Sequence, residues 1–193
     1  MSKKVIAIIG GIGSGKSVVS TILRTIGYGV YDCDSRAKVV MDNSREIKEA
    51  LVAAFGVDAV DPDGVINRPY IAKIVFSDKE ALQKLNGIVH PAVEADLRRW
   101  ISNDTQRIVF VETAILRESG LDCLVDGVWH VTAPEEVRIE RVMKRNNLPR
   151  EAVEARIRSQ KTEEGSSGLP KVKIINDDRH SVLPQVMRLL EGL

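Results

Sequence analysis

A glycine-rich segment near the start of the chain constrains its fold more than any other feature. Residues 10–17 read Gly-Gly-Ile-Gly-Ser-Gly-Lys-Ser and match the pattern Gly-x-x-x-x-Gly-Lys-[Ser/Thr] at every fixed position. A short apolar run, residues 5–9, precedes the segment, and apolar residues at helical spacing, such as Val19 and Leu23, follow it. A strand, a glycine-rich loop and a helix in this order predict a phosphate-binding loop.

The residue types in this loop indicate how a nucleoside triphosphate would bind. Glycines let successive backbone N–H groups converge on an anion, and the helix adds the partial positive charge of its N-terminus. Lys16 is expected to reach the β- and γ-phosphates, and the hydroxyl of Ser17 is expected to ligate Mg²⁺. The predicted ATP-binding residues of the loop are Gly11, Ile12, Gly13, Ser14, Gly15, Lys16 and Ser17.

The rest of the chain alternates short apolar runs with helical patterns. This alternation predicts an α/β fold with a five-stranded, mostly parallel sheet and helices on both faces. The predicted strands are residues 5–9, 30–31, 108–111, 128–131 and 172–175.

One connection in this pattern is much longer than a crossover needs. Residues 34–106 contain no convincing buried strand, and their spacing predicts helices at 34–41, 44–55, 69–76, 79–86 and 91–101. The Ser-x-x-Glu spacing from Ser77 to Glu80 predicts a capping box at one helix start. If the chain is a kinase, we expect residues 34–106 to be an insertion that binds the acceptor substrate, the molecule that receives the phosphoryl group. The alternative is a purely structural helical layer. The nucleotide-binding core is then residues 1–33 and 107–193.

We interpret a second helical segment, residues 134–168, as a lid within the core. Thr132 is a candidate helix cap, and Pro149 should break the segment into two helices. The residues Gly165, Ser166, Ser167 and Gly168 predict a flexible return to the sheet.

Charge and cysteine content limit the possible partners. The 28 Lys and Arg nearly balance the 27 Asp and Glu, which argues against a general affinity for nucleic acid. Two cysteines, Cys33 and Cys123, are best explained as free thiols in a reducing compartment. No apolar stretch approaches the roughly 20 residues of a membrane helix. We therefore expect a cytoplasmic protein without membrane contact, either a monomer or a weak homo-oligomer.

Two aspartates follow the predicted second strand, at the edge where open α/β sheets bind ligands. A carboxylate at Asp32 or Asp34 could accept a proton from an acceptor hydroxyl, or could cap the next helix. The loop followed by Asp32-Cys33-Asp34 resembles the dephospho-CoA kinase family, which usually reads Gly-Gly-Ile-Gly-Ser-Gly-Lys-Ser-Thr and then Asp-Ala-Asp. The resemblance covers nearly the whole chain. It implies transfer of the γ-phosphoryl of ATP, with Mg²⁺, to the 3′-hydroxyl of dephospho-CoA, giving coenzyme A and ADP.

The resemblance also implies roles for individual residues. Arg138, Arg141 and Arg145 share one helix face that suits phosphate oxygens, although a solvated basic face would look the same. In the family the arginine that matches Arg141 contacts ATP from the lid. The resulting assignment is catalytic for Asp34, Lys16 and Arg141, nucleotide-binding for Arg145 and Asn176, and acceptor-binding for Asp32, His90 and Glu118.

The chain departs from the family pattern at three places. Val18 replaces a threonine, and the segment from Glu112 to Glu118 lacks the usual proline and aromatic residue. Ile175-Asn176-Asp177 replaces the order Ile-Asp-Asn, which affects an adenine contact implied for Asn176. Alternative readings are another small-molecule or nucleotide kinase of this fold, a GTP-binding switch, and a nucleotide-binding module without catalysis.

Overall fold

The chain forms two compact units. The computed structural model describes residues 3–160 and 168–193. The first unit, called the core below, combines Met1–Tyr31 with Asp104–Leu193. The second, the insertion, is Asp32–Asn103, close to the range 34–106 expected from the sequence. That the insertion binds an acceptor stays a prediction.

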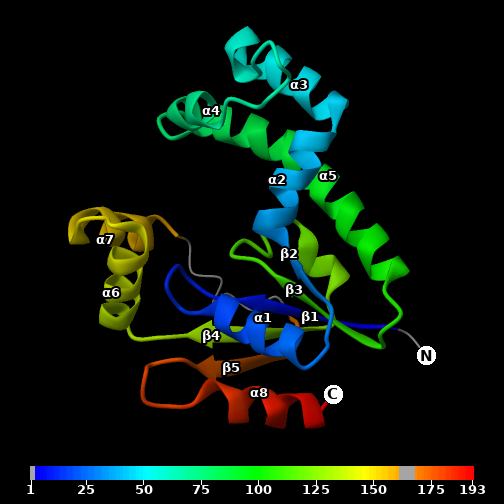
Figure 1. The fold of residues 1–193 in the computed structure, drawn as a ribbon, viewed down its shortest axis with the longest axis vertical. Helices are drawn as coiled ribbons and strands as arrows, with labels where there is room; N and C mark the ends of the chain where they lie inside the picture. Colours follow the sequence, from blue (N-terminus) through cyan, green and yellow to red (C-terminus); the bar gives the residue numbers. More distant parts are fainter. Residues whose placement is uncertain (1–2, 161–167) are drawn as a thin grey trace. The chain divides into compact units, whose positions relative to one another are not determined.

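A five-stranded sheet organises the core (Figure 1). Its strand order is β2-β3-β1-β4-β5, and the pairs of β1 with β3, β1 with β4 and β4 with β5 are parallel. The predicted fold class and all five predicted strands are therefore confirmed. The strands are β1 (Lys4–Ile9), β2 (Val30–Asp32), β3 (Ile108–Glu112), β4 (Gly127–Thr132) and β5 (Lys171–Ile175).

The register of the parallel strands brings their carboxyl ends to one edge. Ile8 pairs with Glu112 on β3, and Ile9 pairs with His130 on β4. Beyond β5, the amide of Asn176 still donates to the carbonyl of Thr132 at 2.8 Å. Ligands of open α/β sheets bind at this edge, so a binding site is expected at the segments that follow β1, β3, β4 and β5.

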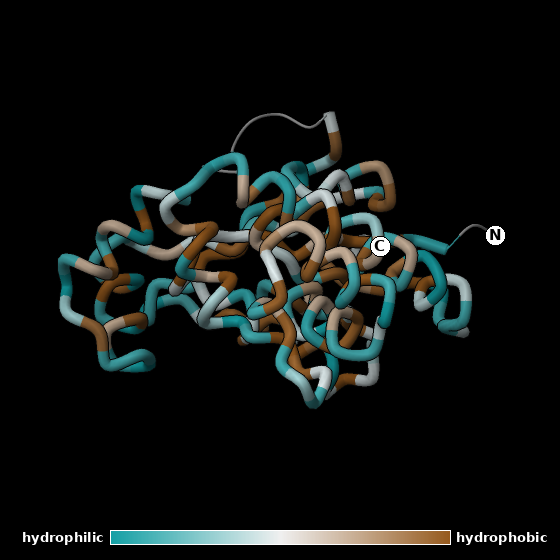
Figure 2. Tube along the Cα trace, turned by 90° about the horizontal axis from the view of Figure 1, so that it is seen from above, coloured by the Kyte–Doolittle hydropathy of each residue, from teal (hydrophilic) through white to brown (hydrophobic). Residues whose placement is uncertain are grey.

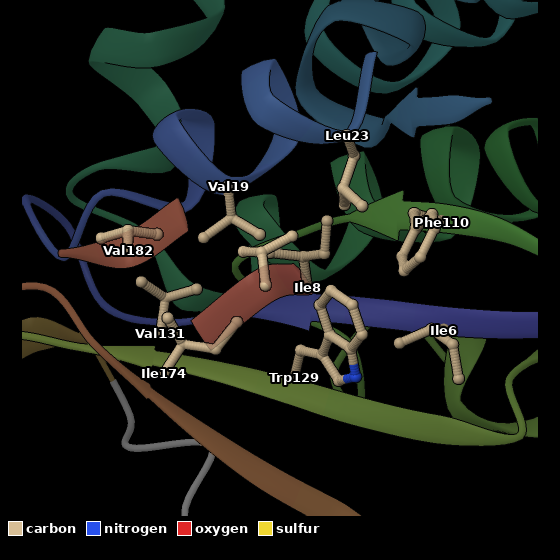
Figure 3. Packing of buried hydrophobic residues seen from close by; sticks show 10 residues of the cluster. Ile6, Ile8, Val19, Leu23, Phe110, Trp129, Val131, Ile174 and Val182 are labelled. Carbon is tan, nitrogen blue, oxygen red and sulfur yellow. The ribbon is translucent and has the colours of Figure 1, made fainter. Parts of the chain in front are cut away.

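Alternating strand residues and two helices build the apolar centre of the core. Ile8, Trp129 and Val131 face Val19 and Leu23 of α1 (Lys16–Thr25), together with α8 (Val182–Glu191) (Figure 3). Hydrophobic and hydrophilic residues alternate along the chain because each element buries one face (Figure 2). Full burial of one such side chain stabilises the fold by about 1.5–3 kcal/mol. This packing holds α1, and the loop before it, against the sheet.

Two helices after β4 form a hairpin. They are α6 (Glu135–Asn146) and α7 (Arg150–Ser159), and they pack together through Ile139, Val142 and Val153. The break expected at Pro149 is confirmed: Asn147 ends α6 in the left-handed conformation and Pro149 precedes α7.

The predicted cap of this hairpin is wrong. Thr132 belongs to β4 and its hydroxyl donates to the carbonyl of Ile174, so α6 begins without a side-chain cap. Of the predicted return loop, residues 165–167 lie outside the described residues.

The insertion is a separate helical unit with its own apolar centre. Ile47, Leu51 and Phe55 of one helix pack with Ile66 and Ile71. Ser44 and Asn67 cap two of its helices through their side chains, as their residue types favour. The helices are α2 (Cys33–Asn43), α3 (Arg45–Phe55), α4 (Arg68–Val75) and α5 (Lys79–Asn103). A short 3₁₀ turn, η1 (Val57–Ala59), lies between α3 and α4, and another, η2 (Leu121–Leu124), lies in the core.

Helix α5 corrects two predictions. It runs without a break through Pro91, where two helices, 79–86 and 91–101, were expected. Its cap is Asp78, which accepts from the amides of Glu80 and Ala81, whereas Ser77 turns back to the carbonyls of Lys73 and Ile74. An interior proline costs about 3 kcal/mol or more. Apolar packing on both sides of it keeps the helix continuous, through Leu85, Ile88, Ala92, Val93 and Leu97.

Candidate active site

The glycine-rich loop lies where the sequence predicts it, between β1 and α1. Gly13 and Gly15 have φ angles of 77° and 93°, which side-chain-bearing residues rarely adopt. The fit around them is also tight, because a Cβ at position 13 would lie 2.6 Å from the carbonyl oxygen of Arg138. Glycine is therefore required both by the turn of the loop and by its contact with α6.

The amides of the loop fall into two groups. The amide of Ile12 donates to Oε1 of Gln160 at 2.7 Å, and that of Ser14 donates to the carbonyl of Gly11 at 3.1 Å. The amides of Gly13 and Gly15 have no acceptor within residues 3–160 and 168–193. Two such backbone donors, separated by one residue and close to a helix N-terminus, are suited to an anion.

The carbonyls of the same loop are held by side chains from distant parts of the chain. Nε of Arg138 donates to the carbonyl of Ile12 at 2.9 Å, and Nη1 of Arg141 to that of Gly13 at 3.3 Å. Nδ2 of Asn176 donates to the carbonyl of Ser14 at 2.9 Å. Three consecutive carbonyls are thus bonded by α6 and by the residue that follows β5.

Lys16 and Ser17 differ in how far the chain engages them. The ammonium group of Lys16 donates to the carbonyl of Gly10 at 2.7 Å, so it lies along the loop. The side chain of Ser17 is exposed and makes no hydrogen bond in the described part of the chain. Its hydroxyl is therefore accessible to a metal ion, the role predicted for it.

The three arginines of α6 do not share one environment. Arg138 and Arg141 contact the loop, and Arg141 also pairs with Asp178 and donates to Oδ1 of Asn176 at 3.3 Å. Arg145 is exposed, and its Nε donates to Oδ1 of the adjacent Asn146 at 2.8 Å. The structure therefore brings Arg138, to which the sequence analysis gave no individual role, to the loop, whereas no hydrogen bond joins Arg145 to the loop within the described residues.

The two aspartates at the start of the insertion have different surroundings. Asp32 is the N-cap of α2: its carboxylate accepts from the amides of Asp34 and Ser35, and from the hydroxyl of Ser35 at 2.7 Å. Asp34 is exposed in the first turn, and its carboxylate has no partner in the described chain. Cys33 between them is buried. Of the two carboxylates, that of Asp34 is the one open to a substrate.

The remaining predicted residues lie on other elements. Glu118 is exposed on the segment before η2. His90 is half-buried in the interior of α5, so it does not start a helix as its sequence context suggested. Their roles toward a substrate stay predictions.

A pocket of about 490 Å³ opens beside the loop within the core. Ser14 lines it, and its buried hydroxyl has no hydrogen-bond partner in the described chain. Other parts of its wall come from the end of β4, the hairpin and β5, with Arg138, Arg158, Gln160 and Lys173 among the lining residues. The cationic lining suits an anionic ligand.

Ionised side chains fix the hairpin and the turn after β5. Arg150 of α7 bonds both carboxylate oxygens of Glu136 on α6, at 2.6 and 2.9 Å, and this bond lowers the pKa of Glu136. The backbone N–H of His180, followed by its imidazole, lowers the pKa of Asp177. Asp177 thereby stabilises the turn that carries its neighbours Asn176 and Asp178.

Residues 4–181 match the sequence profile of the family described as dephospho-CoA kinase. The chain belongs to the dephospho-CoA kinase family. The dephospho-CoA kinase of Porphyromonas gingivalis is 41% identical to it over 96% of this chain and 92% of its own. That of Moorella thermoacetica is 40% identical over 81% and 76%.

Two solved structures are similar to the chain over nearly its whole length. A crystal structure from Thermus thermophilus superposes with a TM-score of 0.83 at 36% identity, covering 100% of this chain and 96% of its own. The dephospho-CoA kinase of Campylobacter jejuni gives a TM-score of 0.69 at 25% identity, covering 98% and 96%. The family predicted from the loop and the Asp-x-Asp segment is confirmed.

Sequence reasoning missed part of the loop's surroundings. Gln160 and Asp178 were not predicted to take part, and Asn176 was predicted to contact adenine rather than the carbonyl of Ser14. No local pattern marks these residues, because their contacts span more than thirty positions of the chain. The one sequence signal for Asn176 and Asp178 is their position after a predicted strand, because residues that follow parallel strands gather at one edge of the sheet.

Proposed function

We propose that this chain transfers the γ-phosphoryl group of ATP to the 3′-hydroxyl of dephospho-CoA, giving coenzyme A and ADP. The observation that carries the proposal is the loop, where the amides of Gly13 and Gly15 have no acceptor within the described residues and the carbonyls of the same peptides are bonded by Arg138 and Asn176. Membership in the dephospho-CoA kinase family supports the choice of acceptor.

The core would bind the phosphate donor. The amides of Gly13 and Gly15 and the N-terminus of α1 would attract the triphosphate, and Lys16 would move from the carbonyl of Gly10 to phosphate oxygens. Arg141, which lies against the loop, would neutralise part of the charge that develops during transfer.

A divalent cation fits the same end of the loop. The exposed hydroxyl of Ser17 stands at the first turn of α1 without a partner in the described chain, and Mg²⁺ prefers such an oxygen together with phosphate oxygens. Mg²⁺ bound there supplies positive charge that offsets the charge of the phosphates.

Asp34 in the insertion would act as the general base. Its exposed carboxylate accepts the proton of the acceptor hydroxyl as that oxygen forms a bond to the γ-phosphorus. The bond from the γ-phosphorus to the β–γ bridging oxygen breaks, and ADP leaves with the electron pair. No phosphorylated enzyme forms in this scheme.

Acceptor-dependent ADP release tests this proposal. The purified chain is incubated with ATP and Mg²⁺ and one acceptor at a time, from dephospho-CoA to nucleoside monophosphates, shikimate and gluconate. We expect rapid ADP release only with dephospho-CoA, and a product phosphorylated at the ribose 3′-oxygen by ³¹P NMR. Faster turnover with another acceptor would show that the chain is a different small-molecule kinase.

A further inference from the structure

Each side chain that holds a loop carbonyl also sets the direction of an amide. A trans peptide is planar, so its C=O and its N–H point in opposite directions. The carbonyl of Ile12 shares its peptide with the amide of Gly13, and that of Ser14 shares its peptide with the amide of Gly15. Arg138 and Asn176 bond these two carbonyls. The amides of Gly13 and Gly15, which have no acceptor within the described residues, are therefore amides whose directions these side chains fix.

The loop needs such anchors because of its own glycines. A glycine adopts positive and negative φ with similar ease, so a peptide next to Gly13 or Gly15 can rotate at low cost. After such a rotation the carbonyl oxygen would point toward the anion and repel it. A bond of about 1 kcal/mol or more to the carbonyl opposes that rotation and keeps the amide available.

Asn176 is itself held firmly. It is buried, its backbone amide continues the β4–β5 ladder, and its Oδ1 accepts from Arg141, which in turn pairs with Asp178. Its Nδ2 lies 1.9 Å from the place that a Cβ at position 15 would take, so the contact depends on Gly15. The side-chain amide thus fills the space left by a missing side chain in the loop.

We propose that Asn176 and Arg138 are positioning residues that orient the phosphate-binding amides of Gly15 and Gly13. They act through the carbonyls of Ser14 and Ile12 and not by touching the adenine base. The inference rests on the proposed function only in that the ligand is a polyphosphate chain. It differs from the adenine contact that the family resemblance implies for Asn176.

Inorganic tripolyphosphate separates the two roles, because it carries the phosphates of ATP without a base or a sugar. Its dissociation constant, and that of ATP, are measured by calorimetry for the full chain and for Asn176→Ala. If Asn176 orients the amide of Gly15, both ligands should lose about five- to thirtyfold in affinity, since an unmet buried carbonyl costs about 1–2 kcal/mol.

The matched control is Asn43→Ala. Nδ2 of Asn43 also donates to a backbone carbonyl, that of Val39 at 2.7 Å, but on α2 of the insertion. The control loses the same kind of hydrogen bond and should bind tripolyphosphate as the unchanged chain does. Thermal unfolding of both variants without ligand shows whether each is folded.

Two results would overturn the proposal. In one, Asn176→Ala binds tripolyphosphate within twofold of the unchanged chain while its affinity for ATP falls, which assigns the residue to the base. In the other, neither affinity changes. If Asn176→Ala does not fold, the same titrations use Asn176→Asp, which keeps an acceptor for Arg141 and loses the donor to Ser14. If the chain does not phosphorylate dephospho-CoA, the proposed function is refuted. The comparison of the affinities for tripolyphosphate and ATP would still test the role of Asn176.

Discussion

The phosphate loop and the β2–α2 junction both follow strands of the sheet, yet they are stabilised in opposite ways. Side chains 126 to 162 positions away bond the backbone of the loop at Ile12, Gly13 and Ser14. At the junction, the carboxylate of Asp32 accepts hydrogen bonds from the second and third residues after it. The loop depends on tertiary structure, whereas the junction is a local helix cap.

The difference matches what each region is proposed to do. A donor site gains from amides that are oriented before the phosphates arrive, because ordering them during binding would cost affinity. A general base needs a carboxylate that the chain does not occupy, and the cap formed by Asp32 leaves that of Asp34 exposed. Four predictions test this contrast, from the largest expected effect to the smallest.

The largest effect should separate the two aspartates of the junction. Asp34→Asn removes the proposed base, and kcat should fall at least about a hundredfold with little change in the affinity for ATP. Asp32→Asn is the matched control: asparagine also caps helices, so kcat should fall less than tenfold. Steady-state kinetics with dephospho-CoA decide the matter, and near-normal turnover of Asp34→Asn would remove the base assignment.

The next effect compares two arginines of α6. Arg138→Ala frees the carbonyl of Ile12, and the affinity for tripolyphosphate should fall about five- to thirtyfold. Arg145→Ala removes the same charge from the same helix without touching the loop, so its loss should stay below about threefold. Equal losses in calorimetric titrations would mean that charge, and not anchoring, determines phosphate binding.

A smaller effect concerns the stability of the junction. Asp32→Ala leaves the first amides of α2 without their acceptor, and the free energy of unfolding should fall by about 1 kcal/mol. Asp34→Ala, in the same helical turn but without a partner in the described chain, should change it less. Urea unfolding compares the two variants, and an equal or reversed order would contradict the assignment of Asp32 as the cap.

The smallest expected effect is on the pH dependence of stability, through Asp177 in the turn after β5. The folded chain lowers the pKa of Asp177, so its charge stabilises the fold above the unfolded pKa of about 3.9, and this contribution is lost as the pH falls through the lower folded value. Asp177→Asn should therefore flatten the decline of the unfolding temperature below about pH 4. Asp63→Asn, at an exposed turn where the carboxylate accepts no hydrogen bond from the described residues, should leave that decline unchanged.

The sequence predicts those parts of the structure that local patterns encode. The five apolar runs became strands, and Ser44 and Pro149 mark helix boundaries as their residue types favour. The break expected at Pro91 was wrong, because apolar residues on either side of it pack in one continuous helix. Local propensity fails there because tertiary packing outweighs it.

The candidate site was predictable in its chemistry but not in its geometry. The loop motif and the Asp-x-Asp segment predicted the family, which is confirmed. That Asn176 would bond Ser14, and that Gln160 would bond Ile12, depends on the strand order and on the packing of the hairpin, which no window of sequence contains. The lid role of residues 134–168, the cytoplasmic location, the oligomeric state and the lack of nucleic-acid binding stay predictions.

Both backbone groups of Ile12 are bonded by the same hairpin, its carbonyl by Arg138 of α6 and its amide by Gln160 at the end of α7. Inserting one residue into either helix would turn everything beyond it by about 100° around the helix axis. The number of residues between positions 138 and 160 is therefore constrained, whereas the identity of individual surface residues of the hairpin is not. Variation among relatives in this stretch should appear as substitutions rather than as gains or losses of residues.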